Sequence, residues 1–390
     1  MDKRYGEEGK YGIGGGGLVS AESQRNLEIA EDLCRQGKPT DAVPYLTLAM
    51  KDRNNFDAEI QMAYLSPELS FSVEVLESAE KRARMLLKTR LGSNCFDDSG
   101  PCVGRFFDST LLITRPYMRI LQALVRFYFS TQRYDKGART AIEILRLSPR
   151  DPLNQRWWLA PLLIRTNRPA DALFFCQQWI HSQFTNIDNT NSAFRPPSGN
   201  EPLSPEMYDA GKAECAMVHN AALAAFHVWG GESALAQQLL GLAARSNPAI
   251  FARVLGRRAQ PSEGKFVAHT TYNGAEEAHD YLWIAQDLWM VPEVWDWVNA
   301  SPGVTSMILK CCSRPECQAQ EGSATEFKRC AACQQVVYCG QSCQKADWKS
   351  HKSDCAKQVE RNKIVKDVWK RKPTSAQVFV QDGGAVRLVS

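Results

Sequence analysis

The feature that most constrains this chain is a run of closely spaced cysteines towards its C-terminal end. Of the 13 cysteines in the 390 residues, eight fall between Cys311 and Cys355. Zinc is held by four soft ligands in a tetrahedron, and two ligands a few residues apart let one turn of backbone offer both to the same ion. The candidate ligands form four such pairs: Cys312 and Cys317, Cys330 and Cys333, Cys339 and Cys343, and His351 and Cys355.

Eight ligands in 44 residues predict two zinc ions with a structural role. The segment has very few aliphatic residues, so metal binding must supply the free energy that folds it. Two complete sets of four leave no coordination position for a catalytic water. The spacing alone allows either successive or alternate pairs to share an ion. It also leaves open whether Cys311 or Cys312 is the first ligand.

The charge of the chain is unevenly distributed. Residues 310–372 contain 14 Lys and Arg against 7 Asp and Glu, whereas the remainder contains 33 against 36. A basic segment suits nucleic acid or an acidic partner. Seven thiolates and two zinc ions together contribute −3, however, which lowers the local surplus from +7 to about +4. That is modest for phosphate binding, so we do not expect nucleic acid to be the partner.

We expect neither a membrane partner nor export. The sequence contains no stretch of about 18 consecutive apolar residues that could cross a bilayer. The first ten residues are charged and lack the apolar run of a secretory signal. The expectation is an intracellular protein, in the nucleus or the cytoplasm.

From about residue 21 to residue 300 the dominant pattern is helical. In three units a small or apolar residue is followed by a small one 12 positions on, and by another buried position 7 after that. These positions are Ala30, Ala42 and Ala49, then Val125, Gly137 and Ile144, then Ala224, Ala236 and Ala243. The spacing resembles the tetratricopeptide repeat, which implies an array of helical hairpins. A generic helical domain is the alternative.

Segments outside this pattern divide the chain. We expect a flexible tail over 1–20, where Gly14 begins a run of four glycines, and a disordered polar loop near 185–205. A basic helix followed by a short hairpin or a disordered tail is expected over 356–390. The tryptophan-rich stretch 275–298 reads as a packing face, since no acidic or small-residue frame for a ligand is evident beside it.

The residues from Phe327 to Cys355 include the elements Tyr-Cys, Cys-Gln-x3-Trp and His-Lys. This run resembles the MYND-type zinc finger over residues 312–355, although the first pair has four intervening residues where many members have two. The resemblance implies interleaved sites. One ion would take Cys312, Cys317, Cys339 and Cys343, and the other Cys330, Cys333, His351 and Cys355.

The same resemblance implies protein binding. MYND fingers commonly bind short proline-rich peptides, which are pre-extended and dock on aromatic surfaces at low entropic cost. By position, Gln344 and Trp348 would line that groove, and simple packing of Trp348 against the zinc core is the alternative. The sequence Pro202-Leu203-Ser204-Pro205 in the long polar loop is close to such a ligand, although one residue short, which suggests that it competes for the groove in cis.

The sequence therefore predicts a mainly α protein, with a tetratricopeptide-like array of helical hairpins followed by a small two-zinc finger. The predicted function is an interaction scaffold or adaptor, not an enzyme. The alternatives are a relative of SET-type protein-lysine methyltransferases and a DNA-binding transcriptional cofactor. We do not favour the methyltransferase, because the Asn-His-Ser-Cys-like stretch and the Tyr-rich end of a SET domain are missing from the sequence. We do not favour DNA binding, because the local charge surplus is modest.

Overall fold

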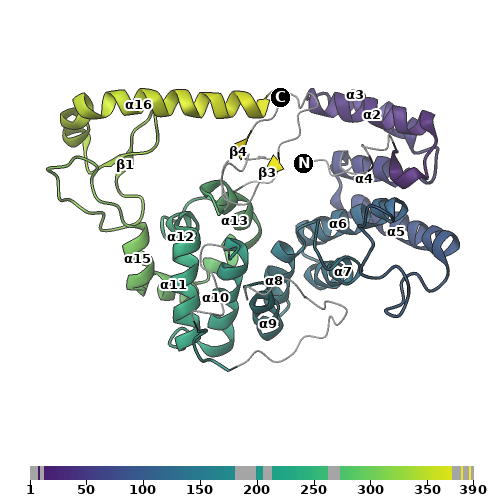
Figure 1. The fold of residues 1–390 in the computed structure, drawn as a ribbon, viewed down its shortest axis with the longest axis horizontal. Helices are drawn as coiled ribbons and strands as arrows, with labels where there is room; N and C mark the ends of the chain where they lie inside the picture. Colours follow the sequence, from purple (N-terminus) through teal and green to yellow (C-terminus); the bar gives the residue numbers. More distant parts are fainter. Residues whose placement is uncertain are drawn as a thin grey trace. The chain divides into compact units, whose positions relative to one another are not determined.

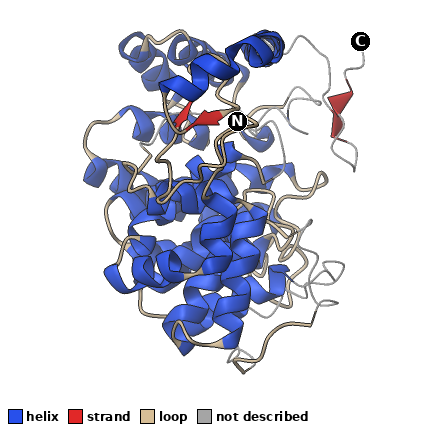
Figure 2. Cartoon of the chain, turned by 90° about the vertical axis from the view of Figure 1, so that its left-hand side faces the viewer, coloured by secondary structure: helices blue, strands red, loops and turns tan. Residues whose placement is uncertain are grey.

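The structure is a computed structural model in which helices dominate (Figure 2). It describes Glu8, residues 13–180, 199–204, 213–261 and 273–370, and two short strands beyond them, with side chains followed as far as residue 364 except at residue 275. The chain divides into two compact units. Unit 1 comprises residues 1–178 and 183–197, and unit 2 comprises residues 179–182 and 198–390. Most of the loop expected near 185–205 lies outside the described residues.

The regular elements of unit 1 in its described part are helices, and residues 92–111 between two of them form turns (Figure 1). In chain order its elements are η2 (Gly15–Gly17), α2 (Ala21–Arg35), α3 (Pro39–Ala49), α4 (Phe56–Leu65), α5 (Leu69–Leu91), η3 (Leu112–Thr114), α6 (Arg115–Ser130), α7 (Tyr134–Leu147), α8 (Arg156–Arg165) and α9 (Pro169–Ile180), whose end falls in unit 2.

Local signals explain where these helices begin and turn. The Ser20 hydroxyl caps α2 by accepting from the backbone N–H of Ser23, and the Asn55 side chain caps α4 in the same way. Gly37 joins α2 to α3 with φ of +76°, a left-handed conformation that glycine adopts without steric cost. The expected helix, short turn and second helix are therefore present.

The first two sequence units form packed helix pairs. Helix α2 packs against α3, and α6 packs against α7. Ala30, Ala42 and Ala49 are all buried in the core between α2, α3 and α4. Gly137 of α7 is equally close-packed, since a Cβ at this position would lie 3.3 Å from the Leu162 side chain. Small residues thus let neighbouring helices approach closely, as the spacing indicated.

Of the flexible tail expected over 1–20, the structure describes Glu8 and residues 13–20. Glu8 is buried, and both of its carboxylate oxygens accept hydrogen bonds from the guanidinium of Arg119 on α6. The N–H of Gly16 donates to Glu8 Oε1 at 2.9 Å. A Cβ at Gly16 would lie 2.6 Å from the carbonyl oxygen of Leu112, so the missing side chain permits this close packing. Gly16 therefore allows the backbone of η2 to lie close to that of η3.

Unit 2 combines further helices with short antiparallel strand pairs (Figure 1). Its elements are α10 (Cys215–Trp229), α11 (Ala234–Ser246), α12 (Pro248–Leu255), α13 (Ala275–Trp289), α14 (Pro292–Ala300), α15 (Pro302–Ile308), β1 (Lys328–Arg329), β2 (Val337–Tyr338), α16 (Gln341–Lys370), β3 (Phe379–Val380) and β4 (Val386–Arg387). Strand β1 pairs with β2, with Lys328 opposite Tyr338, and β3 pairs with β4.

The third sequence unit forms the pair α10 and α11, in which Ala224, Ala236 and Ala243 are all buried. The mainly α fold is confirmed, and the assignment of these pairs to the tetratricopeptide class stays a prediction. In the tryptophan-rich stretch, the Trp289 indole N–H donates to the Tyr281 hydroxyl at 2.9 Å, and both side chains are buried. The packing interpretation therefore holds for these two residues.

Within the described residues, no helix is both long enough and apolar enough to cross a membrane.

Candidate metal centre

The metal centre is built from two turns and the start of one helix. The backbone of Cys312 donates to the carbonyl of Ala319 at 2.8 Å, which closes the first turn. The second turn joins β1 to β2, and in it the N–H of Gln334 donates to the carbonyl of Cys330 at 3.0 Å. Helix α16 begins at Gln341, between the two members of the third ligand pair. Cys343, His351 and Cys355 therefore project from one face of this helix, at intervals of eight and four residues.

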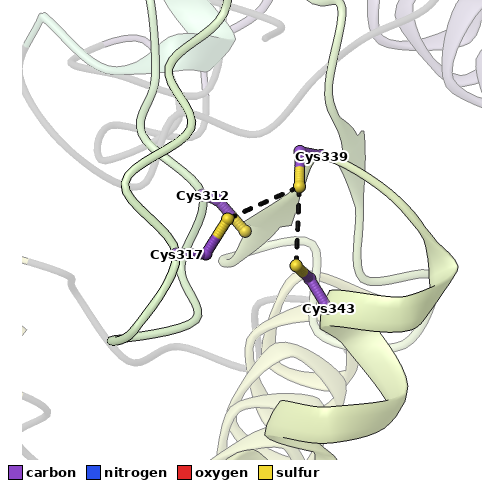
Figure 3. A group of neighbouring side chains, drawn as sticks. All are labelled: Cys312, Cys317, Cys339 and Cys343. Carbon is purple, nitrogen blue, oxygen red and sulfur yellow. Dashed lines mark hydrogen bonds between the residues drawn. The ribbon is translucent and has the colours of Figure 1, made fainter.

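The first cluster consists of Cys312, Cys317, Cys339 and Cys343, whose sulfur atoms all lie within 4.8 Å of one another. Figure 3 shows the four side chains converging from the first turn, from the segment between β2 and α16, and from the start of α16. The Cys317 and Cys339 sulfurs are 3.7 Å apart, and those of Cys339 and Cys343 are 3.5 Å apart. Four sulfurs at about 2.3 Å from a central zinc are about 3.8 Å from each other, so the donor set fits the ion.

The second cluster consists of Cys330, Cys333, His351 and Cys355, and all four residues are buried. The Cys330 and Cys355 sulfurs are 3.8 Å apart, and His351 Nε2 is 3.4 Å from the Cys333 sulfur. A tetrahedral zinc with one nitrogen at about 2.0–2.1 Å requires an N–S separation of about 3.5 Å. The cluster therefore matches a zinc site of three cysteines and one histidine, with His351 coordinating through Nε2.

This arrangement settles both questions that the spacing left open. Alternate ligand pairs share an ion, so the sites are interleaved and not sequential. Cys312 is buried in the first cluster, whereas Cys311 is exposed and forms a β-bridge with Gln320. The structure thus brings together all eight predicted ligands in the predicted sets. One zinc-binding cluster is made of cysteines alone, and the other replaces one cysteine by histidine.

Residues 311–355 also match the family model described as MYND finger. This segment is a MYND zinc finger. Among curated proteins, SET domain-containing protein 14 of Caenorhabditis elegans is 44% identical over 45 residues, which cover 12% of this chain and 10% of that protein. An F-box protein of Arabidopsis thaliana is 47% identical over 49 residues, covering 12% of this chain and 13% of that protein.

The histone-lysine N-methyltransferase ASHR1 of Arabidopsis thaliana is 61% identical over 29 residues, covering 7% of this chain and 6% of that protein. This chain therefore spans only about a tenth of the length of these relatives, and the shared part lies in the MYND finger. No solved structure matches the chain. The finger is a zinc-binding interaction module without catalytic function of its own, and the matches do not extend into the helical body.

Backbone N–H groups lower the pKa of one thiol in each cluster. Burial opposes ionisation of Cys312, but N–H groups of Cys339 and Arg314 outweigh it and lower the pKa of Cys312 to about 7. Burial likewise opposes ionisation of Cys330, and the N–H of Cys333 with the His351 side chain lowers its pKa to about 6. Each cluster thus contains a thiol that readily gives the thiolate that zinc binds.

Three residues that the sequence reasoning missed support the finger. The Tyr338 hydroxyl donates to Asp347 at 2.6 Å, which connects β2 to α16, and this bond lowers the pKa of Asp347. The buried Glu321 carboxylate accepts from the backbone N–H groups of Lys310 and Phe327, which ties both ends of the first turn together. Asp347 shares the zinc-facing side of the helix by its spacing of four, so its position was detectable. The role of Glu321 depends on a loop fold that no spacing reveals.

Gln344 and Trp348 lie one turn apart on α16, beside the ligand-bearing face. Gln344 is half-buried, whereas the Trp348 side chain is 43% exposed. The Trp348 ring lies with its centroid 6.0 Å from that of the ligand His351 in an edge-on arrangement. Their role in peptide binding stays a prediction.

The suggested competitor segment is engaged elsewhere in its described part. Leu203 is buried, and its backbone N–H and carbonyl form two hydrogen bonds of 2.7 Å with the side-chain amide of Gln238 on α11. The leucine that would have entered the finger's groove is thus fixed to the helical body, which speaks against competition in cis.

Proposed function

We propose that this protein is an interaction adaptor whose MYND finger binds short proline-rich segments of partner proteins. The observation that carries this proposal is the exposure of Trp348 on a metal-braced helix. Packing against the zinc core alone would bury the indole, yet 43% of this side chain is exposed. A large aromatic surface held at a fixed position is what an extended proline-rich peptide requires for docking.

The surroundings of Trp348 support a rigid recognition surface. One edge of the ring meets the ring of His351, which the second zinc ion would hold in place. Gln344, one turn earlier, offers an amide that can donate to and accept from a peptide backbone. Because the binding residues would already be ordered, little conformational entropy is lost on binding. The helical body then serves as the scaffold that carries the finger.

The protein is further proposed to be an adaptor and not an enzyme. Relatives named for SET domains or methyltransferase activity match only within the finger, so their names give no support for such activity here. A transfer assay with labelled S-adenosylmethionine and histone substrates tests this point. Incorporation above the background of a zinc-loaded finger alone would instead establish the methyltransferase alternative.

Nucleic acid is not proposed as the partner, since the charge surplus of the finger region is modest once the thiolates are counted. An affinity for DNA that falls steeply with salt would favour the transcriptional-cofactor alternative. An intracellular location, nuclear or cytoplasmic, is proposed because seven zinc-binding cysteines must stay reduced. Imaging of a fluorescently tagged chain tests this location.

The deciding experiment is a peptide-array screen of the full chain beside two single variants. Trp348→Ala removes the proposed contact, and Trp229→Ala is the matched control because Trp229 on α10 is exposed to a similar extent, 41%. We expect proline-rich peptides to bind the parent chain and Trp229→Ala but not Trp348→Ala. Zinc content must remain at two ions per chain in all three. Equal binding by Trp348→Ala would overturn the assignment of the groove.

A further inference from the structure

A pocket in unit 2 lies apart from the zinc ligands and has no part in the proposed peptide binding. It is an open hollow of about 440 Å³ where the end of α10, the start of α11, helix α14 and the start of α15 meet. The volume falls in the range of ordinary small-ligand sites. Its walls combine aromatic side chains with acidic ones: Phe226, Glu232, Glu293, Asp296 and Trp297.

The aromatic part of the pocket is fixed before any ligand arrives. The rings of Phe226 and Trp297 lie 4.8 Å apart at 35°. The Trp297 indole N–H donates to the Gly231 carbonyl at 3.0 Å, and Gln237 donates to the same oxygen at 2.6 Å. A Cβ at Gly231 would lie 2.6 Å from Trp297 Cδ1, so the absence of a side chain lets the indole sit against this turn. These contacts hold both rings in place before a ligand binds, and they leave Phe226 half-buried and Trp297 8% exposed.

The acidic part of the pocket comes from two separate segments. Glu293 and Asp296 are three residues apart on α14 and thus lie on the same side of the helix. Glu232 belongs to the turn between α10 and α11. All three are exposed, and none of them forms an ion pair with any Lys or Arg in the described part of the chain. No basic residue is among the described residues that line the pocket, so three negative charges surround the two rings without a neighbouring cation there.

We infer that this pocket binds a cationic side chain, an arginine of a partner polypeptide, against Phe226 and Trp297. A cation near an aromatic face is attracted by the ring quadrupole, and carboxylates at the rim add direct charge attraction. Arginine suits the site better than lysine because its planar guanidinium stacks on aromatic rings and is weakly hydrated. Its five N–H donors can also reach more than one carboxylate at once. The volume leaves room for the neighbouring residues of the partner.

The test uses the full chain labelled with 5-fluorotryptophan and followed by fluorine NMR. The sequence holds ten tryptophans, and the signal of Trp297 is the one that disappears in Trp297→Phe. The probe is N-acetylarginine amide, and the matched neutral probe is N-acetylcitrulline amide. We expect saturable shifts of the Trp297 signal with the arginine probe and none with citrulline. No shift, or equal shifts with both probes, would overturn the inference.

Charge variants separate a specific pocket from general attraction. Glu293→Gln combined with Asp296→Asn should weaken arginine binding by about fivefold or more. The control removes two exposed carboxylates of unit 1, Asp41→Asn with Glu74→Gln, and should leave the affinity unchanged. If both double variants lose affinity equally, the pocket is not the site.

Two further variants cover the remaining risks. Glu232 is exposed in the turn between α10 and α11, so its replacement by Gln should not disturb folding. Glu232→Gln therefore provides a test if the variant with both Glu293→Gln and Asp296→Asn fails to fold. It should weaken arginine binding while the circular dichroism spectrum stays unchanged, and undiminished binding would count against the pocket. Trp348→Ala should not affect the Trp297 response, so this inference and the peptide-binding proposal can fail independently.

Discussion

Replacing Arg119 by methionine should strongly destabilise unit 1. The guanidinium of Arg119 donates to Asp57 with two bonds of 2.7 Å and to Glu8 with bonds of 2.6 and 3.2 Å. Its side chain is only 9% exposed, and those of Asp57 and Glu8 are 3% and 1% exposed. Burial alone would lower the pKa of Arg119, but its two carboxylate partners raise it above the usual value. One cation thus compensates two buried anions.

The magnitude follows from the charges left behind. Removing one partner of a buried ion pair costs about 3–5 kcal/mol, because the remaining charge is desolvated and unpaired. Arg119→Met leaves two such carboxylates, so we expect a loss at or above the upper part of that range. A triple variant that adds Glu8→Gln and Asp57→Asn removes the charges as well. It should recover part of the loss, because a buried amide without a partner costs about 1–3 kcal/mol, less than an unpaired buried charge.

Hydrogen exchange measured by mass spectrometry suits this test, because a chain with two units need not unfold in one step. A loss of about 3–5 kcal/mol corresponds to exchange about 10²–10⁴ times faster over α6. The control is Arg35→Met on α2, whose pair with Asp32 is 49% and 59% exposed and should contribute less than about 1 kcal/mol. Exchange within fivefold of the parent in Arg119→Met, or a triple variant no better than the single one, would refute the reasoning.

Three further predictions concern unit 2. Cys312→Ser should lower the zinc content measured by mass spectrometry to one ion or fewer, whereas Cys311→Ser should keep two, since only Cys312 belongs to a cluster; equal loss in both would contradict the assignment. Burial lowers the pKa of His219 to about 3, so below its ordinary pKa the unfolded state binds a proton that the folded state excludes. The stability of α10 by hydrogen exchange should therefore fall by about 2 kcal/mol more between pH 7 and pH 5 in the parent than in His219→Leu, and equal slopes would exclude His219 as the cause. Gly231→Ala should cost about 1–3 kcal/mol by the same measurement, because the new methyl group meets the Trp297 indole; an unchanged exchange rate would show that the turn can yield.

The parts of this protein that depend on short-range spacing were predictable from its sequence. The four ligand pairs follow from cysteines and a histidine three to five residues apart, which one turn of backbone can direct at one ion. The helix pairs follow from small residues at fixed intervals, because Ala30 and Ala42 must face each other wherever two helices approach closely. The ligand pairs and the helix pairs thus both arise from residues close together in the sequence, and the folded structure contains both.

The parts that depend on long-range contact could not be predicted in this way. Glu8 pairs with a residue 111 positions away, and nothing near it in the sequence indicates a buried partner. The acidic frame around Trp297 combines Glu293 and Asp296 of the tryptophan-rich stretch with Glu232, which lies 65 residues before Trp297. Only the fold brings these two segments together at one pocket. The spacing of the ligands was compatible with sequential as well as interleaved pairing. Only the path of the backbone between the ligand pairs determines which pairs share an ion.

The interleaving connects metal binding to the proposed recognition surface. Cys339 and Cys343 hold the start of α16 to the first turn, and His351 and Cys355 hold its next turns to the β1–β2 turn. Trp348 lies between these two attachments, five residues after Cys343 and three before His351. The orientation of its ring therefore depends on both ions, since either one alone leaves one side of this helical segment unattached. Loss of a single ion should thus remove peptide binding even though no binding residue has changed.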